Sequence, residues 1–293
     1  MRRVFSICLG IAKPILQFLL CCLLSHHLFH SPNASAANSA ETSVVWVDHD
    51  AISPLPGQAS EDQLRFLPIF VFTDGGCLPA SALDADGRVG SGLNASGKMN
   101  GGCLGFDQAN IYTQTLNIKG STVFAYGLYF PKDGSNPNSV GGHRHDWEHV
   151  LVWTHDGIVD RVTFFQHAGY YTLGADLVKI DQTHPIVYVG KAKHGMYHAR
   201  NNGPGGFIEG LCYFCDTRSD PGLRWLAPHR LLGFESLTAY QQEILQMKIW
   251  GDANSPFRTD NFPQEARSIQ DGALCRDRGC KCDLSTGSCP GFP

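Results

Sequence analysis

The chain has 293 residues, of which 43% are hydrophobic and 11% aromatic, so it is long and apolar enough to bury a full core. Its formal net charge is −4 at pH 7, and it contains no run of basic residues. This charge pattern excludes a nucleic-acid-binding protein of the usual basic type and a simple electrostatic attraction to anionic lipids. A length of this order allows one or two domains, and β-sandwiches of this size are often single domains.

The first 40 residues are predicted to be a secretory signal peptide with cleavage at about residues 36–40, because a basic start precedes an apolar run and small residues. A membrane anchor is the alternative, but the longer apolar window is interrupted by Lys13, Pro14 and Gln17. We therefore expect a secreted, extracellular protein without a transmembrane span. Removal of the three basic residues in the signal peptide changes the net charge from −4 to −7.

Three of the 11 cysteines lie in the signal peptide, which leaves eight in the mature chain. An even number of cysteines in an exported chain predicts disulfides, but eight cysteines allow 105 pairings and the sequence does not choose among them. Proximity suggests a local bridge between Cys212 and Cys215. It also suggests bridges within the group of Cys275, Cys280, Cys282 and Cys289. A zinc knuckle is the competing interpretation of that last group, and export disfavours it.

Most of the mature chain is predicted to form β-strands, because runs of β-branched and aromatic residues alternate with Gly-containing turns. The expected strands are 43–48, 68–73, 111–118, 122–130, 144–154, 158–167 and 186–189. The stretch 75–105 is rich in Gly, Ala, Ser and Asn and is expected to be largely loop. It contains the glycosylation acceptor Asn94-Ala95-Ser96. Many short strands predict a mainly β fold, a single-domain antiparallel β-sandwich with flanking helices.

Two helices are predicted to flank these strands. The capping-box pattern from Ser60 to Gln63 predicts a short helix that ends near Phe66. A second helix, capped at Ser236 and ended by Gly251, is predicted from apolar residues that recur at helical spacing, Leu237, Tyr240, Ile244 and Met247. Its apolar stripe is better explained by the core than by membrane insertion. The domain is expected to cover 41–266, followed by a cysteine-rich C-terminal extension over 267–293.

The stretch Gly142–Glu148 contains two histidines, two carboxylates, an arginine and a tryptophan, and it runs on into the strand predicted to begin near Arg144. Side chains alternate faces along a strand, so Asp146 and Glu148 are predicted to share one face. The opposite face would then carry His145, Trp147, His149, Leu151 and Trp153.

Two carboxylates one pleat apart repel each other unless a positive charge lies between them. Asp146 and Glu148 are therefore a candidate pair for a hard divalent cation, calcium or magnesium. His143 could add a nitrogen ligand, and a loop rich in Gly, Ser, Asn and Pro could fold Asp133 back onto the site.

Two other interpretations of this cluster remain open. It could be a solvated strand start with surface ion pairs, since charged residues are mostly exposed. Alternatively, His143, His145 and His149 could bind zinc or iron as in a cupin-type site, although Glu148 follows the second histidine more closely than that motif allows.

The sequence resembles the necrosis- and ethylene-inducing-peptide-like proteins (NLPs). Gly142–Glu148 reproduces the heptapeptide of that family, which is a specific signal because it is rich in rare residue types. Other segments that match the family are Val47–Ala51, Gly76-Cys77, Cys103, Tyr129–Asp133 and Thr183–Tyr188. The resemblance extends from Val45 to Trp250, which is most of the mature chain.

This resemblance implies an actinoporin-like β-sandwich in which Cys77 pairs with Cys103. It implies a non-enzymatic, monomeric cytolysin whose divalent cation, calcium or magnesium, helps to bind the sugar of glycosyl inositol phosphorylceramides. These sphingolipids lie in the outer leaflet of the plant plasma membrane, and membrane damage, necrosis and defence responses would follow. The implied metal ligands are Asp133, His143, Asp146 and Glu148.

Four further residues receive roles from the resemblance. His194 would take part in head-group recognition. His167 lies in a region similar to a Ser-x-His-Gly stretch of the family and would do the same, although a lone histidine is often structural. Arg144 and His145 would brace the site instead of binding the metal.

Two alternative functions also fit the sequence. The first is a non-cytotoxic family member that binds a surface glycan. It is suggested by the eight mature cysteines and by Leu128, which stands where the family usually has tryptophan. The second is a secreted metal-dependent hydrolase with Glu148 or His145 as the base. Against that second function, the chain contains no nucleophile elbow and no His-Glu-x-x-His motif.

Overall fold

A computed structural model describes residues 43–134, 141–166, 169–191, 193–199 and 223–272, together with the backbone of Cys275 and Arg276. The predicted signal peptide and the candidate residue His167 lie outside these ranges. Five of the cysteines for which disulfides were predicted also lie outside them, Cys212, Cys215, Cys280, Cys282 and Cys289. Of Cys275 only the backbone is described.

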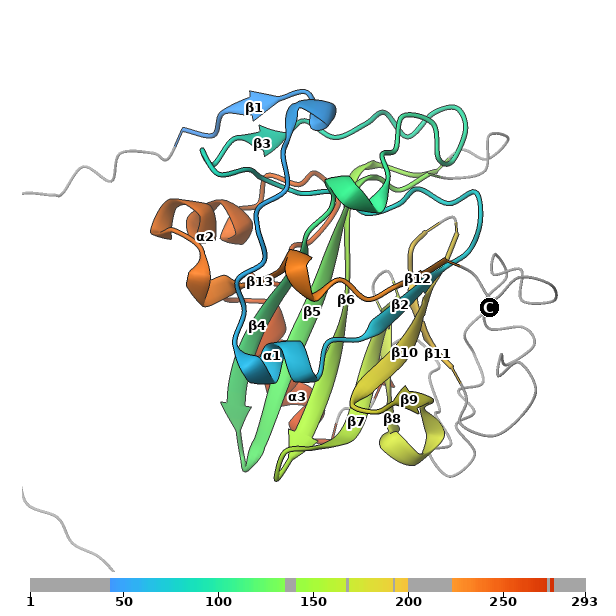
Figure 1. Cartoon of the computed structure of the whole chain (residues 1–293), viewed down its shortest axis with the longest axis vertical. Coiled ribbons are helices and arrows are strands. Elements are labelled where there is room, and N and C mark those ends of the chain that lie inside the picture. The colour runs from blue at the N-terminus through green and yellow to red at the C-terminus, as the bar shows by residue number, and fades with distance from the viewer. Residues whose placement is uncertain are drawn as a thin grey trace, which may run out of the picture. The chain divides into compact units, whose positions relative to one another are not determined.

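The larger of two main sheets has seven strands in the order β13-β4-β5-β6-β7-β8-β14 (Figure 1). Its bounds are β4 (Ile111–Ile118), β5 (Ser121–Lys132), β6 (Arg144–His155), β7 (Ile158–Gln166), β8 (Gly169–Gly174), β13 (Leu231–Gly233) and β14 (Cys275–Arg276). The long neighbours pair antiparallel as predicted, and β13 pairs parallel with β4. The Asp156-Gly157 turn between β6 and β7 has positive φ at both residues, 49° and 73°, as a two-residue hairpin turn requires.

The second sheet has the order β11-β10-β2-β12, with β9 paired to β10. Its strands are β2 (Ile69–Phe72), β9 (Ile180–Asp181), β10 (His184–Val189), β11 (Met196–His198) and β12 (Leu223–Trp225). The neighbours β2 and β10 run parallel. Both sheets contribute side chains to the main apolar core, for example Phe70 and Val187 from this sheet and Phe130 and Val150 from the larger one. The two sheets therefore form a β-sandwich.

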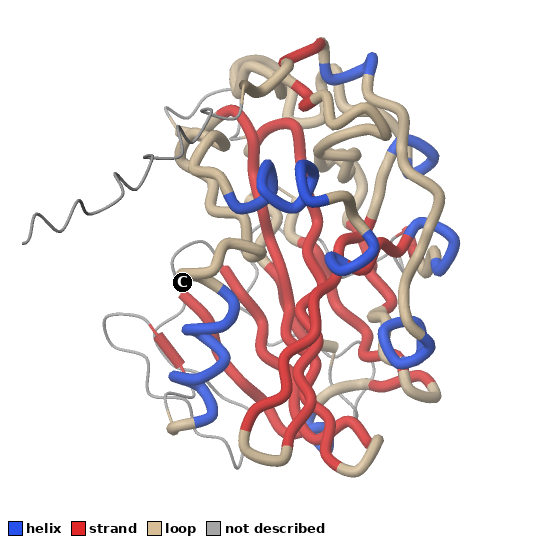
Figure 2. Tube along the Cα trace, turned by 90° about the vertical axis from the view of Figure 1, so that its left-hand side faces the viewer, coloured by secondary structure: helices blue, strands red, loops and turns tan. Residues whose placement is uncertain are grey.

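Helices cover the outer face of the larger sheet. Helix α3 (Phe262–Gln270) lies behind that sheet in Figure 1 and to one side of it in the turned view of Figure 2. Its apolar side contributes Phe262, Ala266 and Ile269 to a second core with Leu151 and Trp153. Helix α2 (Ala239–Gln246) packs Ile244 and Leu245 into a third cluster. The apolar faces of α2 and α3 therefore both pack into the core, as predicted for the α2 region.

Short elements complete the fold. They are α1 (Glu61–Arg65), the two-stranded pair β1 (Trp46–Val47) and β3 (Val89–Gly90), and five 3-10 turns, η1 (His49–Ala51), η2 (Phe106–Gln108), η3 (Ala175–Leu177), η4 (Pro228–Arg230) and η5 (Phe234–Ser236). Helix α1 carries the predicted capping box, in which Ser60 accepts from the backbone of Gln63 and Gln63 accepts from the backbone of Ser60. The stretch 75–105 is largely loop and is closed by the Cys77–Cys103 disulfide, as predicted.

Two sequence predictions about boundaries were wrong in detail, and one helix was missed. The first strand is limited to Trp46–Val47, because only β3 is available to pair with it. The cap of α2 is Thr238, whose hydroxyl accepts from Gln241, whereas Ser236 ends a 3-10 turn. Helix α3 was not predicted, and it extends across the position at which the C-terminal extension was expected to begin.

Candidate functional site

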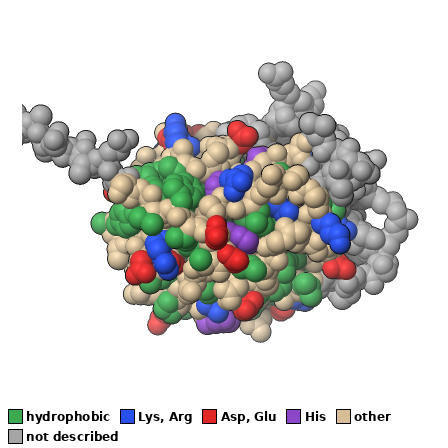
Figure 3. Space-filling view, turned by 90° about the horizontal axis from the view of Figure 1, so that it is seen from above, with side chains coloured by type: hydrophobic (Ala, Val, Ile, Leu, Met, Phe, Trp, Pro, Cys, Tyr) green, Lys and Arg blue, Asp and Glu red, His purple; other side chains and the backbone are tan. Residues whose placement is uncertain are grey.

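The candidate site lies where β6 begins, because there the strand has a neighbour on one side only. Strand β5 pairs with β6 from Arg144 onward, whereas the register with β7 starts at Val150 opposite Phe164. Among the described residues, the first six of β6 are thus paired with β5 alone. Seen from this end of the sandwich, carboxylate and histidine side chains gather near the middle of the surface (Figure 3).

The two faces of β6 divide its side chains as the alternation predicted. Asp146 lies opposite Phe130 and Glu148 opposite Leu128, and these two β5 residues belong to the core between the sheets. Trp147 packs instead into the cluster beneath α2, and Leu151 packs into the cluster beneath α3. Asp146 and Glu148 are therefore directed toward the second sheet, although both are at the open end of the sandwich.

The structure brings Asp133 and His143 together at this end, and we call Asp133, His143, Asp146 and Glu148 the carboxylate cluster. The backbone N–H of Asp133 donates to the carbonyl of His143 at 2.9 Å, which closes the intervening loop. The His143 Nε2 atom then lies 3.6 Å from Oδ2 of Asp133. The other ring nitrogen of His143, Nδ1, donates to the carbonyl of His145 at 2.6 Å and so fixes the orientation of the ring.

His194 lies beside Asp146, although the two residues are 48 positions apart in the sequence. Its Nδ1 donates to Oδ2 of Asp146 at 2.8 Å, while the backbone N–H of Trp147 donates to Oδ1 at 3.0 Å. The His194 ring is 1% exposed and stacks on Phe130 with a centroid distance of 3.8 Å. Both oxygens of Asp146 are thus held in fixed directions.

The electrostatics of the carboxylate cluster favour a cation. Burial of the Asp133 carboxyl, followed by the negative charge of Asp146, raises the pKa of Asp133. The Asp133 side chain is almost fully buried, and its Oδ1 has no hydrogen-bond partner among the described residues. A buried carboxylate oxygen that faces a like charge needs a positive partner.

The donor set of this cluster fits calcium or magnesium, because three carboxylates and one imidazole supply mostly hard oxygen ligands. In the part of the chain that the structure describes, no three His, Cys, Asp or Glu side chains already converge in metal-binding geometry. The chemistry of the residues and the orphaned Asp133 oxygen are therefore what supports a cation here. The cupin-type alternative does not fit, because His145 and His149 are on the face opposite to the carboxylates.

On that opposite face, His145 is buried in an aromatic cage. The Tyr129 hydroxyl donates to its Nδ1 at 2.7 Å, and Trp46 and Trp250 each lie 5.6 Å from its ring. Burial, followed by the charges of Arg144 and His143, lowers the pKa of His145 to about 4. Arg144 donates to the carbonyls of Ser91 and Gly92, so that it ties β6 to the disulfide-closed loop.

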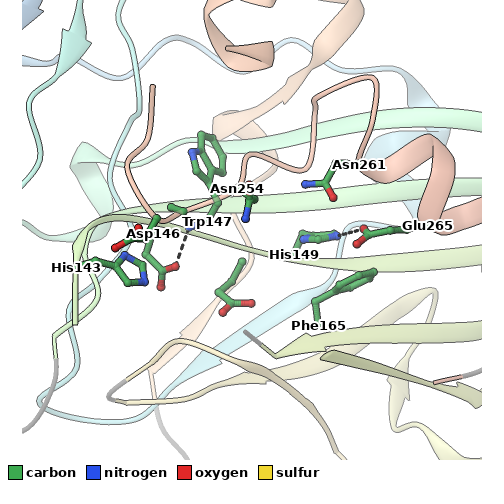
Figure 4. Close-up of a pocket in the computed structure, with 11 residues that line it drawn as sticks. His143, Asp146, Trp147, His149, Phe165, Asn254, Asn261 and Glu265 are labelled. Atoms are coloured by element: carbon green, nitrogen blue, oxygen red, sulfur yellow. Dashed lines mark hydrogen bonds and ion pairs between the residues drawn. The ribbon is translucent and has the colours of Figure 1, made fainter. Parts of the chain in front are cut away.

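A cavity of about 350 Å³ extends from the carboxylate cluster along the free edge of β6 to helix α3. Figure 4 shows His143 and Asp146 at one end and His149, Phe165, Asn261 and Glu265 at the other. His149 at the α3 end belongs to β6 and was considered from the sequence only as a zinc or iron ligand, whereas Phe165, Asn261 and Glu265 were not predicted as site residues. Asn261 and Glu265 lie at the start of α3 and within it, about a hundred positions after β6, and no local pattern connects them to that strand.

The remaining candidates are placed as follows. Asn94 is exposed in the loop closed by Cys77 and Cys103, and its side-chain oxygen accepts from the backbone of Ser96 at 3.1 Å. Across the described ranges, no helix is both long and apolar enough to cross a bilayer.

Comparison with known proteins identifies relatives over most of the chain. The family model described as "Necrosis inducing protein (NPP1)" matches residues 60–268. The chain is 30% identical to NLP effector protein 10 of Phytophthora capsici, with 74% of this chain and 88% of the relative covered. It is 27% identical to the necrosis-inducing protein NPP1 of Phytophthora nicotianae, with 78% and 92% covered.

Solved structures share the fold. The necrosis and ethylene inducing protein 2 from the causal agent of cocoa's witches' broom disease aligns with a TM-score of 0.61 at 24% identity, covering 77% of this chain and 98% of that one. NLPPya in complex with mannosamine aligns at 0.59 and 23%, covering 78% and 98%. The non-toxic HaNLP3 protein aligns at 0.59 and 22%, covering 75% and 97%.

Proposed function

The chain belongs to the necrosis-inducing protein (NPP1) family, and from that premise we propose that it is a secreted, cytolysin-like effector of plant cells. In this proposal it acts by binding, not by catalysis. Its ligand is the sugar of glycosyl inositol phosphorylceramides in the outer leaflet of the plant plasma membrane, and binding leads to membrane damage, necrosis and defence responses.

The carboxylate cluster is the observation that carries this proposal. Asp133, His143, Asp146 and Glu148 come from the residue after β5, a loop and the free start of β6, all at the same open end of the sandwich. Such an end is accessible to a lipid head group, whereas the middle of the sandwich is closed by the core. NLPPya has been solved in complex with the amino sugars mannosamine and glucosamine, which supports a sugar as the ligand class.

Each residue of the site has a physical role in this proposal. Asp133, Asp146 and Glu148 would supply oxygen ligands and His143 a nitrogen ligand to calcium or magnesium. His194 holds Asp146, and the carbonyl of His145 orients His143. A bound dication with open positions would accept hydroxyl oxygens of a sugar.

Leaf infiltration with the mature protein, wild type beside Asp146→Ala, tests the proposal. We expect lesions with wild type and none with Asp146→Ala, together with loss of calcium binding by calorimetry. Circular dichroism and the melting temperature establish that the variant is folded. Necrosis of wild-type strength from a folded Asp146→Ala protein would refute a role for the carboxylate cluster.

A second candidate function is a non-cytotoxic glycan-binding effector. It is favoured by the similarity of the fold to the non-toxic HaNLP3 protein, which is as high as the similarity to NLPPya. In this case the wild-type protein would bind calcium and glycosylated sphingolipid but leave the leaf intact. The same infiltration, combined with a vesicle-binding assay, separates the two candidates.

A further inference from the structure

The cavity beside β6 has a second polar end, away from the carboxylate cluster. We call this end the α3 subsite and define it by His149, Asn254, Asn261 and Glu265, with Phe165 as its apolar wall. In Figure 4 these residues face the same space as His143 and Asp146 but lie on the side of α3. They come from β6, β7, α3 and the loop before α3.

The α3 subsite exists because β6 begins at Arg144 but pairs with β7 only from Val150 onward. Beyond the Val150–Phe164 pair, no pairing between the described residues of these strands closes the edge of β6. A strand edge presents alternate backbone N–H and C=O groups to whatever lies beside it. Along this edge the backbone N–H of Trp147 is bonded to Asp146, and polar side chains line the cavity beside it.

A buried histidine and a buried carboxylate face each other at this end. His149 and Glu265 have side chains that are only 7% and 10% exposed, and His149 Nε2 lies 3.5 Å from Oε2 of Glu265. His149 Nε2 makes no hydrogen bond among the described residues, while the ring stacks on Phe165 at 3.8 Å. A ligand hydroxyl can both donate and accept, so it can satisfy an imidazole and a carboxylate at the same time.

The charge of the cavity restricts the ligand. Its described lining includes four carboxylate side chains, those of Asp146, Glu148, Asp252 and Glu265, and no lysine or arginine. A ligand that carries phosphate or carboxylate would be repelled at the α3 end, whereas hydroxyl and amine groups would find acceptors. Its total volume of about 350 Å³ is within the range of small-ligand sites.

From these observations we infer that the α3 subsite binds a sugar ring that is neutral or carries an amine, as the unit next to the one held at the carboxylate cluster and on the side of it away from the inositol phosphate. This inference rests on the proposed function, because it extends the same ligand along the cavity. The amide groups of Asn254 and Asn261 would form hydrogen bonds with ring hydroxyls. Glu265 would accept from a hydroxyl or an ammonium, and the Phe165 ring would exclude water from the far wall of the subsite.

The test is titration of the ¹⁵N-labelled mature chain with glucosamine, followed by NMR, with calcium present and with calcium chelated. The side-chain amides of Asn254 and Asn261 report on the α3 subsite. The backbone amide of Trp147, which donates to Asp146, reports on the carboxylate cluster. We expect the asparagine signals to shift under both conditions and glucuronate, an anionic sugar, to leave them unmoved.

Two variants establish that any shift is direct. Glu265→Gln keeps the size of the side chain but removes its charge, and Asn254→Ala changes an exposed loop residue. Each is expected to weaken glucosamine binding at the asparagine signals roughly tenfold, since a hydrogen bond to a charged group, or two neutral ones, contributes on the order of 1.4 kcal/mol. Glu61→Gln, on the surface of α1, is the matched control and should bind as wild type does.

The outcomes separate this inference from the proposed function. If the Trp147 signal moves with calcium while both asparagine signals stay still, sugar binds only at the carboxylate cluster and the α3 subsite is refuted. If the asparagine signals move but Trp147 is indifferent to calcium, the subsite stands and the proposed metal-dependent function fails. If no signal moves, or if both variants bind as tightly as wild type, the inference is overturned.

Discussion

His194 and Asp146 are joined by a hydrogen bond of 2.8 Å between Nδ1 and Oδ2, and both side chains are buried. The histidine comes from a loop between β10 and β11 of the second sheet, and the aspartate comes from β6 of the larger sheet. This contact therefore connects the two sheets at the candidate site. It also directs one oxygen of Asp146, as outer partners of metal-binding carboxylates generally do.

We predict that His194→Ala weakens calcium affinity by about 10- to 100-fold without unfolding the protein, because loss of such an outer partner has effects of that size. His194→Gln retains a hydrogen-bond donor, so its calcium affinity should lie between that of His194→Ala and that of wild type. Calorimetric titration with calcium measures both. His229→Ala, at an exposed position, is the control. Equal calcium affinity in wild type and His194→Ala would contradict a positioning role.

Asp133→Asn should make the metal-free protein more stable and at the same time insensitive to calcium. Burial and the charge of Asp146 raise the pKa of Asp133, so the ionised group destabilises the fold once the pH rises above its folded-state pKa. Removal of that charge at neutral pH is expected to add about 1 kcal/mol, or roughly 2–4 °C in Tm. Thermal unfolding with and without calcium measures this change, with the exposed Asp74→Asn as control. A Tm of calcium-free Asp133→Asn below that of calcium-free wild type would contradict this prediction.

The buried His145 should make the fold sensitive to acid. Its folded-state pKa is lowered from 6.5 to about 4, so the unfolded chain binds a proton more readily than the folded chain does. The contribution of neutral His145 to the free energy of unfolding is thus fully present above about pH 6.5, and it is lost as the pH falls from there toward about pH 4.

The variant His145→Asn, which keeps an acceptor for Tyr129 but does not titrate, should flatten this part of the pH profile. The free energy of unfolding of wild type is expected to fall by up to about 1.4 kcal/mol per pH unit more steeply than that of the variant. Urea unfolding at several pH values, in chelator, gives both slopes. Parallel profiles would mean that other groups dominate acid unfolding.

Loss of the Cys77–Cys103 disulfide should destabilise the chain and weaken the site. The two cysteines are 26 positions apart, and their loop accepts a hydrogen bond from the buried Lys132 through the carbonyl of Lys98 at 2.9 Å. Replacement of both cysteines by serine is expected to cost about 2–5 kcal/mol. Lys132 precedes Asp133, so calcium affinity should decrease as well. Urea unfolding and calcium titration of Cys77→Ser/Cys103→Ser measure these effects, and unchanged calcium affinity would show that the loop does not support Asp133.

Much of the fold could be predicted from local sequence. Strands β4 to β7 followed from runs of β-branched and aromatic residues, and the Asp156-Gly157 hairpin followed from its turn chemistry. Helix α3 was missed because its short apolar stripe, Phe262, Ala266 and Ile269, is interrupted by polar residues and has no side-chain cap. Its helical state depends on contact with the outer face of the larger sheet, and no local signal reports that contact.

The sequence by itself determined the division of β6 into two faces, because the alternation of side chains is a property of the strand backbone. It also predicted Asp133, His143, Asp146 and Glu148 as one candidate site, since they lie within 16 positions of one another. Only the tertiary structure placed His194 against Asp146, His145 in its aromatic cage, and Glu265 opposite His149. The physical reason is that His194 is 48 positions from Asp146 and Glu265 is 116 positions from His149, and their contacts arise from the stacking of sheets and helices, which no local period of the sequence encodes.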